Sequence, residues 1–283
     1  MRFMALGLVI GLLLSVPARG EAGKQLRVMS FNIRYDTPQD GANAWPLRKE
    51  MVFQTIENFD PDLLGLQEVQ PGQGKQLMER LKEYEMVGVP RSEGPRSELS
   101  PAMFKRDRFE KVRSGTFWLS ETPEVPGSKG WDADLPRICT WVELRDKQAG
   151  GRSIVFFNTH WDHKGREARA ASARLMGSRI ADIAGDKPVI ITGDFNTAQD
   201  SPPYKELLAD RFFDSFAETH AAPTREDFTF HAFTGRSDRG HWRIDWVLRS
   251  NAFRTINADI DRTNDNGRYP SDHFPVAAVF EWR

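Results

Sequence analysis

The stretch Val189-Ile190-Ile191-Thr192-Gly193-Asp194-Phe195-Asn196 decides how this 283-residue chain is interpreted. Its apolar start is short and rich in β-branched residues, which is typical of a buried strand. Asp194 and Asn196 follow directly, and the end of a strand in an α/β protein delivers side chains to the rim of a sheet, where sites lie. Taken alone, residues 194–196 are also consistent with an Asx-type turn.

The same arrangement recurs along the chain, because other short apolar runs also adjoin carboxylate, carboxamide or imidazole side chains. The runs are 26–31 followed by Asn32, 63–66 followed by Gln67 and Glu68, 154–157 followed by residues 158–163, 244–248 containing Asp245, and 276–280 preceded by residues 271–273. Each of these residues has an ordinary explanation when it is considered alone: Glu68 as a solvated side chain and His160 as a core histidine. Considered as one set, the polar groups are harder to explain, because burying so many of them without a ligand would cost several kcal/mol.

Helices are expected between some of these strands. Apolar residues at helical spacing predict one helix from near Pro46 to Asp60 and another that ends at Gly185. Glycine, proline and serine cluster in 91–101 and 122–136, which predicts long loops of the kind that often carry function. With no internal repeat, the chain is interpreted as a single α/β domain.

Composition excludes several classes of protein. The chain has 39 basic and 40 acidic residues, so it has no strongly basic coat for nucleic acid, although a local basic patch such as 91–113 stays open. A single cysteine makes neither an internal disulfide nor a thiolate zinc site. The ordinary hydrophobic content of 39% excludes a wholly disordered chain.

The N-terminal residues 1–22 have the layout of a secretory signal peptide, with Arg2, an apolar run over 4–14, Pro17 and then small residues. We therefore expect an exported protein, periplasmic or secreted, with its domain over 23–283. The run is short for a bilayer span, so no stable membrane insertion is expected after cleavage. A buried first helix or an uncleaved anchor are the alternatives.

The side chains at the strand ends suit one chemistry. Carboxylate and amide oxygens are ligands for Mg²⁺ or Mn²⁺, and also for Ca²⁺. Two histidines can stabilise charge on a phosphoryl oxygen, and a further aspartate and asparagine can hold the attacking water. The combination indicates metal-assisted hydrolysis of phosphoesters.

The ordered motifs resemble the endonuclease/exonuclease/phosphatase superfamily. They are Ser30-Phe31-Asn32, Gln67-Glu68-Val69, Asn158-Thr159-His160, Gly193-Asp194-Phe195-Asn196, Arg243-Ile244-Asp245 and Ser271-Asp272-His273. The resemblance implies an α/β fold of the DNase-like type, a four-layered αββα sandwich of two mixed β-sheets flanked by helices. It covers nearly all of the chain after residue 22.

The resemblance also implies a role for each matched residue. Glu68 is expected to be the principal metal ligand, with Asn32 beside it and Asp272 at the metal edge. The catalytic residues implied are Asp194 for the nucleophilic water, Asn196 to position that water or a phosphate oxygen, His273 oriented by Asp245, and His160 as a second histidine over the phosphate.

Residues 32–36 and 159–163 are most similar to the exported bacterial members and the deadenylase-like branch. Four further residues are candidates for substrate contacts: Asp36, Arg137, His163 and His231. For Arg137, a surface ion pair explains the residue as well as a phosphate contact does. For His231, a position in the core is more common than a functional one. We expect a monomer that acts on a phosphorylated small molecule, a nucleotide or a lipid headgroup, without requiring nucleic acid.

Three alternatives stay open at this stage. The first is a nuclease or a sphingomyelinase-like diesterase. The second is a binuclear zinc hydrolase, which residues 160–163 (His-Trp-Asp-His) resemble only faintly. The third is a catalytically silent binding module of the same fold.

Overall fold

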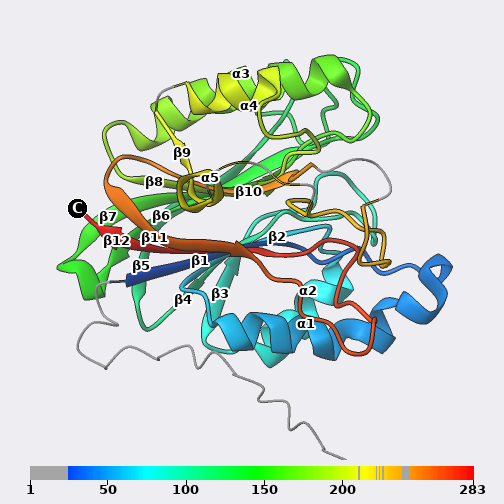
Figure 1. Ribbon diagram of the computed structural model, residues 1–283. Coiled ribbons are helices and arrows are strands. Elements are labelled where there is room, and N and C mark those ends of the chain that lie inside the picture. The colour runs from blue at the N-terminus through cyan, green and yellow to red at the C-terminus, as the bar shows by residue number, and fades with distance from the viewer. Residues whose placement is uncertain (1–24, 210, 221, 223, 225, 238–241) are drawn as a thin grey trace, which may run out of the picture.

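The protein is a sandwich of two six-stranded sheets with helices on both outer faces (Figure 1). The computed structural model describes residues 25–209, 211–220, 222, 224, 226–237 and 242–283. The strand orders are β11-β12-β1-β2-β4-β3 and β5-β6-β7-β8-β10-β9. The predicted fold class is therefore confirmed. The signal peptide predicted over 1–22 lies outside the described residues.

In the first sheet, β1 and β2 run parallel and the other neighbouring strands are antiparallel. Its strands are β1 (Gln25–Asn32), β2 (Leu63–Gln67), β3 (Tyr84–Val87), β4 (Ala102–Lys105), β11 (Phe253–Ile260) and β12 (Val276–Trp282). Every residue of β2 is buried, which accounts for its uninterrupted apolar start.

The second sheet repeats this plan, with β7 and β8 as its parallel pair. Its strands are β5 (Phe109–Trp118), β6 (Ile138–Asp146), β7 (Arg152–His160), β8 (Val189–Asp194), β9 (Phe213–Asp214) and β10 (Asp245–Arg249). The six apolar runs predicted as strands are confirmed as β1, β2, β7, β8, β10 and β12. No bounds were predicted for the other six strands.

Both predicted helices are confirmed. In α1 (Trp45–Phe59), Pro46 occupies the first turn and Asp60 ends the helix with a left-handed φ of 52°. In α3 (Arg166–Ala184), Gly185 ends the helix with a φ of 56°. The remaining helices are α2 (Pro71–Arg80), α4 (Pro202–Leu208), α5 (Ser215–Thr219) and the short 3₁₀ segments η2 (Pro38–Asn43) and η3 (Lys147–Ala149).

Three apolar layers hold the sandwich together. The layer between the sheets includes Val28 and Phe156, α1 and α2 pack on the first sheet around Phe53, and α3 and α4 pack on the second around Met176. Figure 1 shows the two helix pairs on opposite sides of the sheets. Within the described residues, no helix is long and apolar enough to cross a membrane.

Towards one end of the sandwich, polar side chains replace the apolar layer between the sheets. Gln67 Nε2 of β2 donates to Asn158 Oδ1 of β7 at 2.8 Å, and Thr192 Oγ1 of β8 donates to the same oxygen at 2.9 Å. Gly65 permits this approach, because a Cβ there would lie 1.9 Å from Thr192 Oγ1. These hydrogen bonds fix the two sheets relative to each other directly beneath the candidate site.

Candidate active site

The site forms where the parallel strand pairs of both sheets end. Asn32 of β1 is in register with Gln67 of β2, and His160 of β7 with Asp194 of β8. Antiparallel β10 starts opposite Asp194, at Asp245. Glu68 and Asn196 adopt left-handed backbone conformations with φ of 62° and 49°. Such conformations are uncommon for residues other than glycine, and here they occur at two predicted site residues.

Asn32 joins two carboxylates that come from different sheets. Its Nδ2 donates to Glu68 Oε1 at 3.1 Å and to Asp194 Oδ2 at 2.9 Å, while its Oδ1 accepts from the Arg34 N–H. All of its side-chain polar atoms therefore have protein partners. In this geometry Asn32 orients Glu68 and Asp194, and a direct contact of Asn32 with a metal stays a prediction.

Asp194 is a buried carboxylate with four polar neighbours, one of which is His160, whose Nε2 lies 3.4 Å from Asp194 Oδ2. Besides Asn32, the Asn196 N–H donates to its Oδ1 at 3.0 Å, and His273 Nε2 lies 3.7 Å from its Oδ2. Burial, reinforced by the nearby Asp245 carboxylate, raises the pKa of Asp194 to about 7. Such a group can exchange a proton with water near neutral pH, which suits a general base.

His273 and Asp245 form a buried pair. His273 Nδ1 lies 2.9 Å from Asp245 Oδ2, and both residues are at least 95% buried. Burial alone would lower the pKa of His273, but Asp245 and then Asp194 raise it to about 10. His273 is therefore an imidazolium at neutral pH. Its Nε2 is left to donate to a developing negative charge.

His160 has a different protonation state. Asn196 Nδ2 donates to the Trp161 carbonyl at 3.0 Å and lies 3.1 Å from His160 Nε2, so that nitrogen accepts the hydrogen bond. Burial, with Arg137 nearby, lowers the pKa of His160 well below its usual value. His160 is therefore neutral and holds Asn196 in place. Both histidines line the same cavity, and the predicted roles of His160 and His273 at the phosphoryl group stay predictions.

The donor set of the site fits a hard divalent cation. Glu68 makes no ion pair with any described residue, and its oxygens accept from Asn32 and from the Tyr35 N–H at 3.1 Å. Arg34 lies 3.8 Å from Asp272, and burial raises the pKa of the Asp272 carboxyl although His273, Arg34 and Arg48 oppose this shift. Half-buried Glu68 and buried Asp272 both face the cavity, and their carboxylate oxygens are the kind of donor that a hard divalent cation takes.

A second acidic group lies deeper in the site. One ligand atom each from Asp194, Asp245 and His273 falls within 4.8 Å of the others, which is close enough for a shared ion. However, these carboxylates keep His273 protonated, and an imidazolium has no lone pair for a metal. Without a metal, a proton on His273 therefore balances the charge of this group, and Glu68 and Asp272 are the other carboxylates that could hold an ion.

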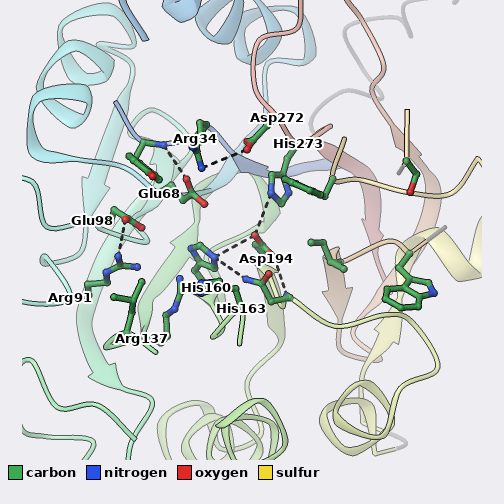
Figure 2. Close-up of a pocket in the computed structure, with 17 residues that line it drawn as sticks. Arg34, Glu68, Arg91, Glu98, Arg137, His160, His163, Asp194, Asp272 and His273 are labelled. Carbon is green, nitrogen blue, oxygen red and sulfur yellow. Dashed lines mark hydrogen bonds and ion pairs between the residues drawn. The ribbon is translucent and has the colours of Figure 1, made fainter. Parts of the chain in front are cut away.

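These side chains line a single cavity of about 610 Å³, shown in Figure 2. The predicted residues in its wall are Glu68, Arg137, His160, His163, Asp194, Asn196, Asp272 and His273. Asn32 and Asp245 support the wall from behind through their hydrogen bonds. Asp36 and His231 do not line the cavity.

The position of His231 has a clear physical reason. Its ring is stacked on Phe274 with ring centroids 3.9 Å apart, and the residue is only 2% exposed. Burial lowers its pKa to about 3, so it is a neutral core residue at neutral pH. The interpretation of His231 as a substrate contact is not supported by this packing.

Several cavity residues were not identified from the sequence. They are Arg34, Tyr35, Arg91, Leu135, Glu98, Phe230, Ser237, Trp242 and Ile244. Arg34 lies inside a quoted motif, and its guanidinium is held by a two-point pairing with Asp40 at 3.0 Å. Arg91 and Glu98 belong to a loop that was predicted from composition, Ile244 lies inside the motif Arg243-Ile244-Asp245, and Trp242 directly precedes that motif.

Comparison with known proteins agrees with this geometry. The model of the Endonuclease/Exonuclease/phosphatase family matches residues 29–273. An endonuclease/exonuclease/phosphatase family protein from Bacteroides thetaiotaomicron is 35% identical, with a TM-score of 0.84 over 92% of this chain and 98% of its own. A mannosyl-6-phosphatase from the same organism is 33% identical, with a TM-score of 0.80 over 91% and 100%. An uncharacterised protein of Acanthamoeba polyphaga mimivirus is 26% identical over 90% of this chain and its full length.

Proposed function

Because the chain belongs to the endonuclease/exonuclease/phosphatase family, whose members hydrolyse phosphoesters, we propose that it is a divalent-metal-dependent hydrolase of small phosphoesters. The observation that carries the proposal is one cavity faced by the acidic groups Glu68, Asp194 and Asp272 and by the cationic His273. That arrangement provides a place for a cation, a base and a charge stabiliser within reach of one phosphoryl group.

Glu68 and Asp272 would hold the metal, for which Mg²⁺ or Mn²⁺ is the best match to oxygen donors. When bound, the ion supplies positive charge to a phosphoryl oxygen. Asn32 keeps the Glu68 carboxylate aimed at the cavity through its hydrogen bond of 3.1 Å. Arg34 lines the same edge and provides a guanidinium for a second phosphoryl oxygen.

Asp194 would take the proton of the attacking water, since burial brings its pKa to about 7. Asn196 holds Asp194 through its own N–H and is itself positioned by neutral His160. His273 donates from Nε2 to the phosphoryl oxygen that gains charge, while Asp245 holds its Nδ1. Removal of His273 or of Asp245 would leave the other residue as a buried charge without compensation.

A small substrate is supported by the size of the cavity, because about 610 Å³ suits a metabolite-sized ligand. The relative named as a mannosyl-6-phosphatase supports a sugar phosphate among the candidates. Nuclease and sphingomyelinase-like activities are the competing substrate classes, and a substrate panel separates them directly.

The test is a panel of sugar phosphates, nucleotides, inositol phosphates, nucleic acids and sphingomyelin, each assayed with Mg²⁺, Mn²⁺ and Ca²⁺. Glu68→Gln keeps the size of the side chain and removes its charge, so activity is expected to fall at least about a thousandfold. Glu143→Gln is the matched control, because Glu143 is a buried carboxylate paired with Arg113 outside the cavity.

Unchanged turnover in folded Glu68→Gln would refute the assignment of the metal site. Metal binding through Glu68 with no turnover of any phosphoester would favour the silent binding module. Activity restored by zinc alone, with no response to Mg²⁺ or Mn²⁺, would favour the binuclear zinc hydrolase.

We also propose export, on the sequence pattern of residues 1–22 alone. Expression of the full chain followed by cell fractionation and intact mass measurement checks it. A mature protein that starts near residue 21 or 23 and lies outside the cytoplasm is expected. A full-length cytoplasmic product would contradict the proposal.

A further inference from the structure

The cavity has a second polar wall that the proposed chemistry does not use. Arg91, Glu98 and Arg137 lie together in Figure 2, on the side of the cavity away from His273 and Asp272. Arg91 and Glu98 come from the loop between β3 and β4, and Arg137 directly precedes β6. Three charged residues with side chains mostly removed from water need a physical reason to be there.

Arg137 is buried, and one of its nitrogens has no protein partner. The residue is 4% exposed, its Nη2 lies 3.0 Å from His163 Nδ1, and its Nε lies 3.4 Å from Asp162 Oδ2. Its Nη1 has no hydrogen-bond partner among the described residues. A buried guanidinium nitrogen left unpaired costs free energy, so a ligand acceptor in this cavity would compensate for it.

Asp162 and His163 hold the guanidinium of Arg137 in place through two of its three nitrogens. Although burial opposes ionisation, backbone hydrogen bonds, including those from Gly165 and Lys164, hold the pKa of Asp162 at about 2. Burial, followed by the Arg137 charge, lowers the pKa of His163, so His163 is the neutral acceptor of the pair. Arg137 is thus oriented through Nε and Nη2, while Nη1 has no hydrogen-bond partner among the described residues.

Arg91 and Glu98 form a pair with unused donor and acceptor atoms. Arg91 Nη2 donates to Glu98 Oε1 at 2.8 Å, and each side chain is 13% exposed. Among the described residues, this is the single hydrogen bond that either side chain makes. Glu98 Oε2 therefore remains an acceptor, and the other guanidinium nitrogens of Arg91 remain donors.

The loop that carries this pair is held by hydrogen bonds to the Arg91 backbone. The Arg91 N–H donates to the Glu98 carbonyl at 2.9 Å, and Trp118 Nε1 donates to the Arg91 carbonyl at 2.7 Å.

A mostly buried ion pair contributes little net stability, because desolvation offsets the attraction between its charges. Its presence in a cavity wall is better explained by recognition of a ligand.

We propose that Arg91, Glu98 and Arg137 bind the hydroxyl groups of the substrate, which makes the protein selective for phosphoesters of sugars or other polyols. The inference rests on the proposed function, in which the phosphoryl group lies between Glu68 and His273. A hydroxyl both donates and accepts, so it matches a wall that offers Arg91 and Arg137 as donors and Glu98 as an acceptor.

Other groups match this wall less well. A second phosphate would meet the Glu98 carboxylate, whose negative charge repels a phosphate oxygen. An apolar chain would leave the guanidinium nitrogens of Arg91 and Arg137 unpaired. The observed set of donors and acceptors therefore favours a hydroxylated, uncharged group attached to the phosphoryl group.

The test compares aldohexose 6-phosphates with n-hexyl phosphate. Both are esters of a primary alcohol, and they differ in the hydroxyl groups. The methyl diesters of the same two alcohols replace them if the enzyme acts on diesters. We expect wild-type kcat/KM to favour the best hexose substrate at least about a hundredfold. Glu98→Gln and Arg137→Lys are each expected to reduce this preference at least about tenfold.

Glu143→Gln again serves as the control, and its preference should equal that of the wild type. Equal turnover of hexose and hexyl esters by the wild type would overturn the hydroxyl-binding wall and leave the proposed hydrolase intact. An equal loss on both substrates in both variants would likewise overturn it. Absence of turnover with every ester, despite correct folding by circular dichroism, would instead overturn the proposed function.

Discussion

Replacing Asp245 by asparagine removes the charge that faces His273 and keeps the size of the side chain. In the wild type, burial disfavours protonation of His273, yet Asp245 and Asp194 raise its pKa to about 10. The pair is joined by a hydrogen bond of 2.9 Å. A hydrogen bond to a charged group contributes roughly 1.5–3 kcal/mol, and one pKa unit corresponds to about 1.36 kcal/mol. The variant should therefore titrate about one to two units lower.

The direct assay is an NMR titration of the imidazole in metal-free protein. Wild-type His273 should stay protonated through about pH 9, and the variant should lose its proton between about pH 8 and 9. If the imidazolium acts on the phosphoryl group, activity is lost as pH rises through the lowered pKa. The ratio of variant to wild-type activity should thus be about tenfold lower at pH 9.5 than at pH 7.

Asp214→Asn is the control for this experiment. Asp214 is also a buried carboxylate, but its partner is Arg243 at 2.6 Å and it does not line the cavity. Its substitution should leave the titration of His273 unchanged. A folded Asp245→Asn protein whose His273 pKa shifts by less than about half a unit would refute the reasoning.

Three other predictions concern stability and the support of the site. Gly65→Ala places a Cβ 1.9 Å from Thr192 Oγ1, so urea denaturation should show that the free energy of unfolding falls by about 2–4 kcal/mol. Gly177→Ala is the control and should not destabilise the protein, because no atom lies within 4 Å of its Cβ. His231 has a folded-state pKa of about 3, below its unfolded value, so wild-type stability should fall with decreasing pH between about 6.5 and 3. His231→Phe should flatten that dependence by up to about 1.4 kcal/mol per pH unit, and an unchanged slope would contradict the assignment. Asn32→Ala removes the hydrogen bonds to two carboxylates and should lower kcat about a hundredfold in steady-state assays, while an undiminished kcat would show that these bonds do not matter.

Six of the eight interior strands were predicted from apolar runs, and in five of them, β1, β2, β7, β8 and β10, most residues are buried. β8 is buried throughout and was identified from its apolar start. β5 and β11 lie at the edges of their sheets, and most of their side chains are exposed or half-buried. Their pattern is therefore polar and resembles a loop. β6 is mostly buried, but Thr140 and Glu143 interrupt its apolar pattern.

The sequence by itself determined an α/β domain, the two long helices and the list of polar residues at strand ends, because these depend on local patterns. The sandwich of two sheets was implied by the resemblance that the ordered motifs carry. The tertiary structure decided which of these residues act on one another. Asn32 contacts Asp194 across 162 residues of sequence, and His273 contacts Asp245 across 28. Protonation follows from such neighbours and from burial, so the division of roles between neutral His160 and cationic His273 was not available from sequence. The same holds for Arg91 and Glu98, whose loop enters the cavity only because the sheets bring β4 and β6 together.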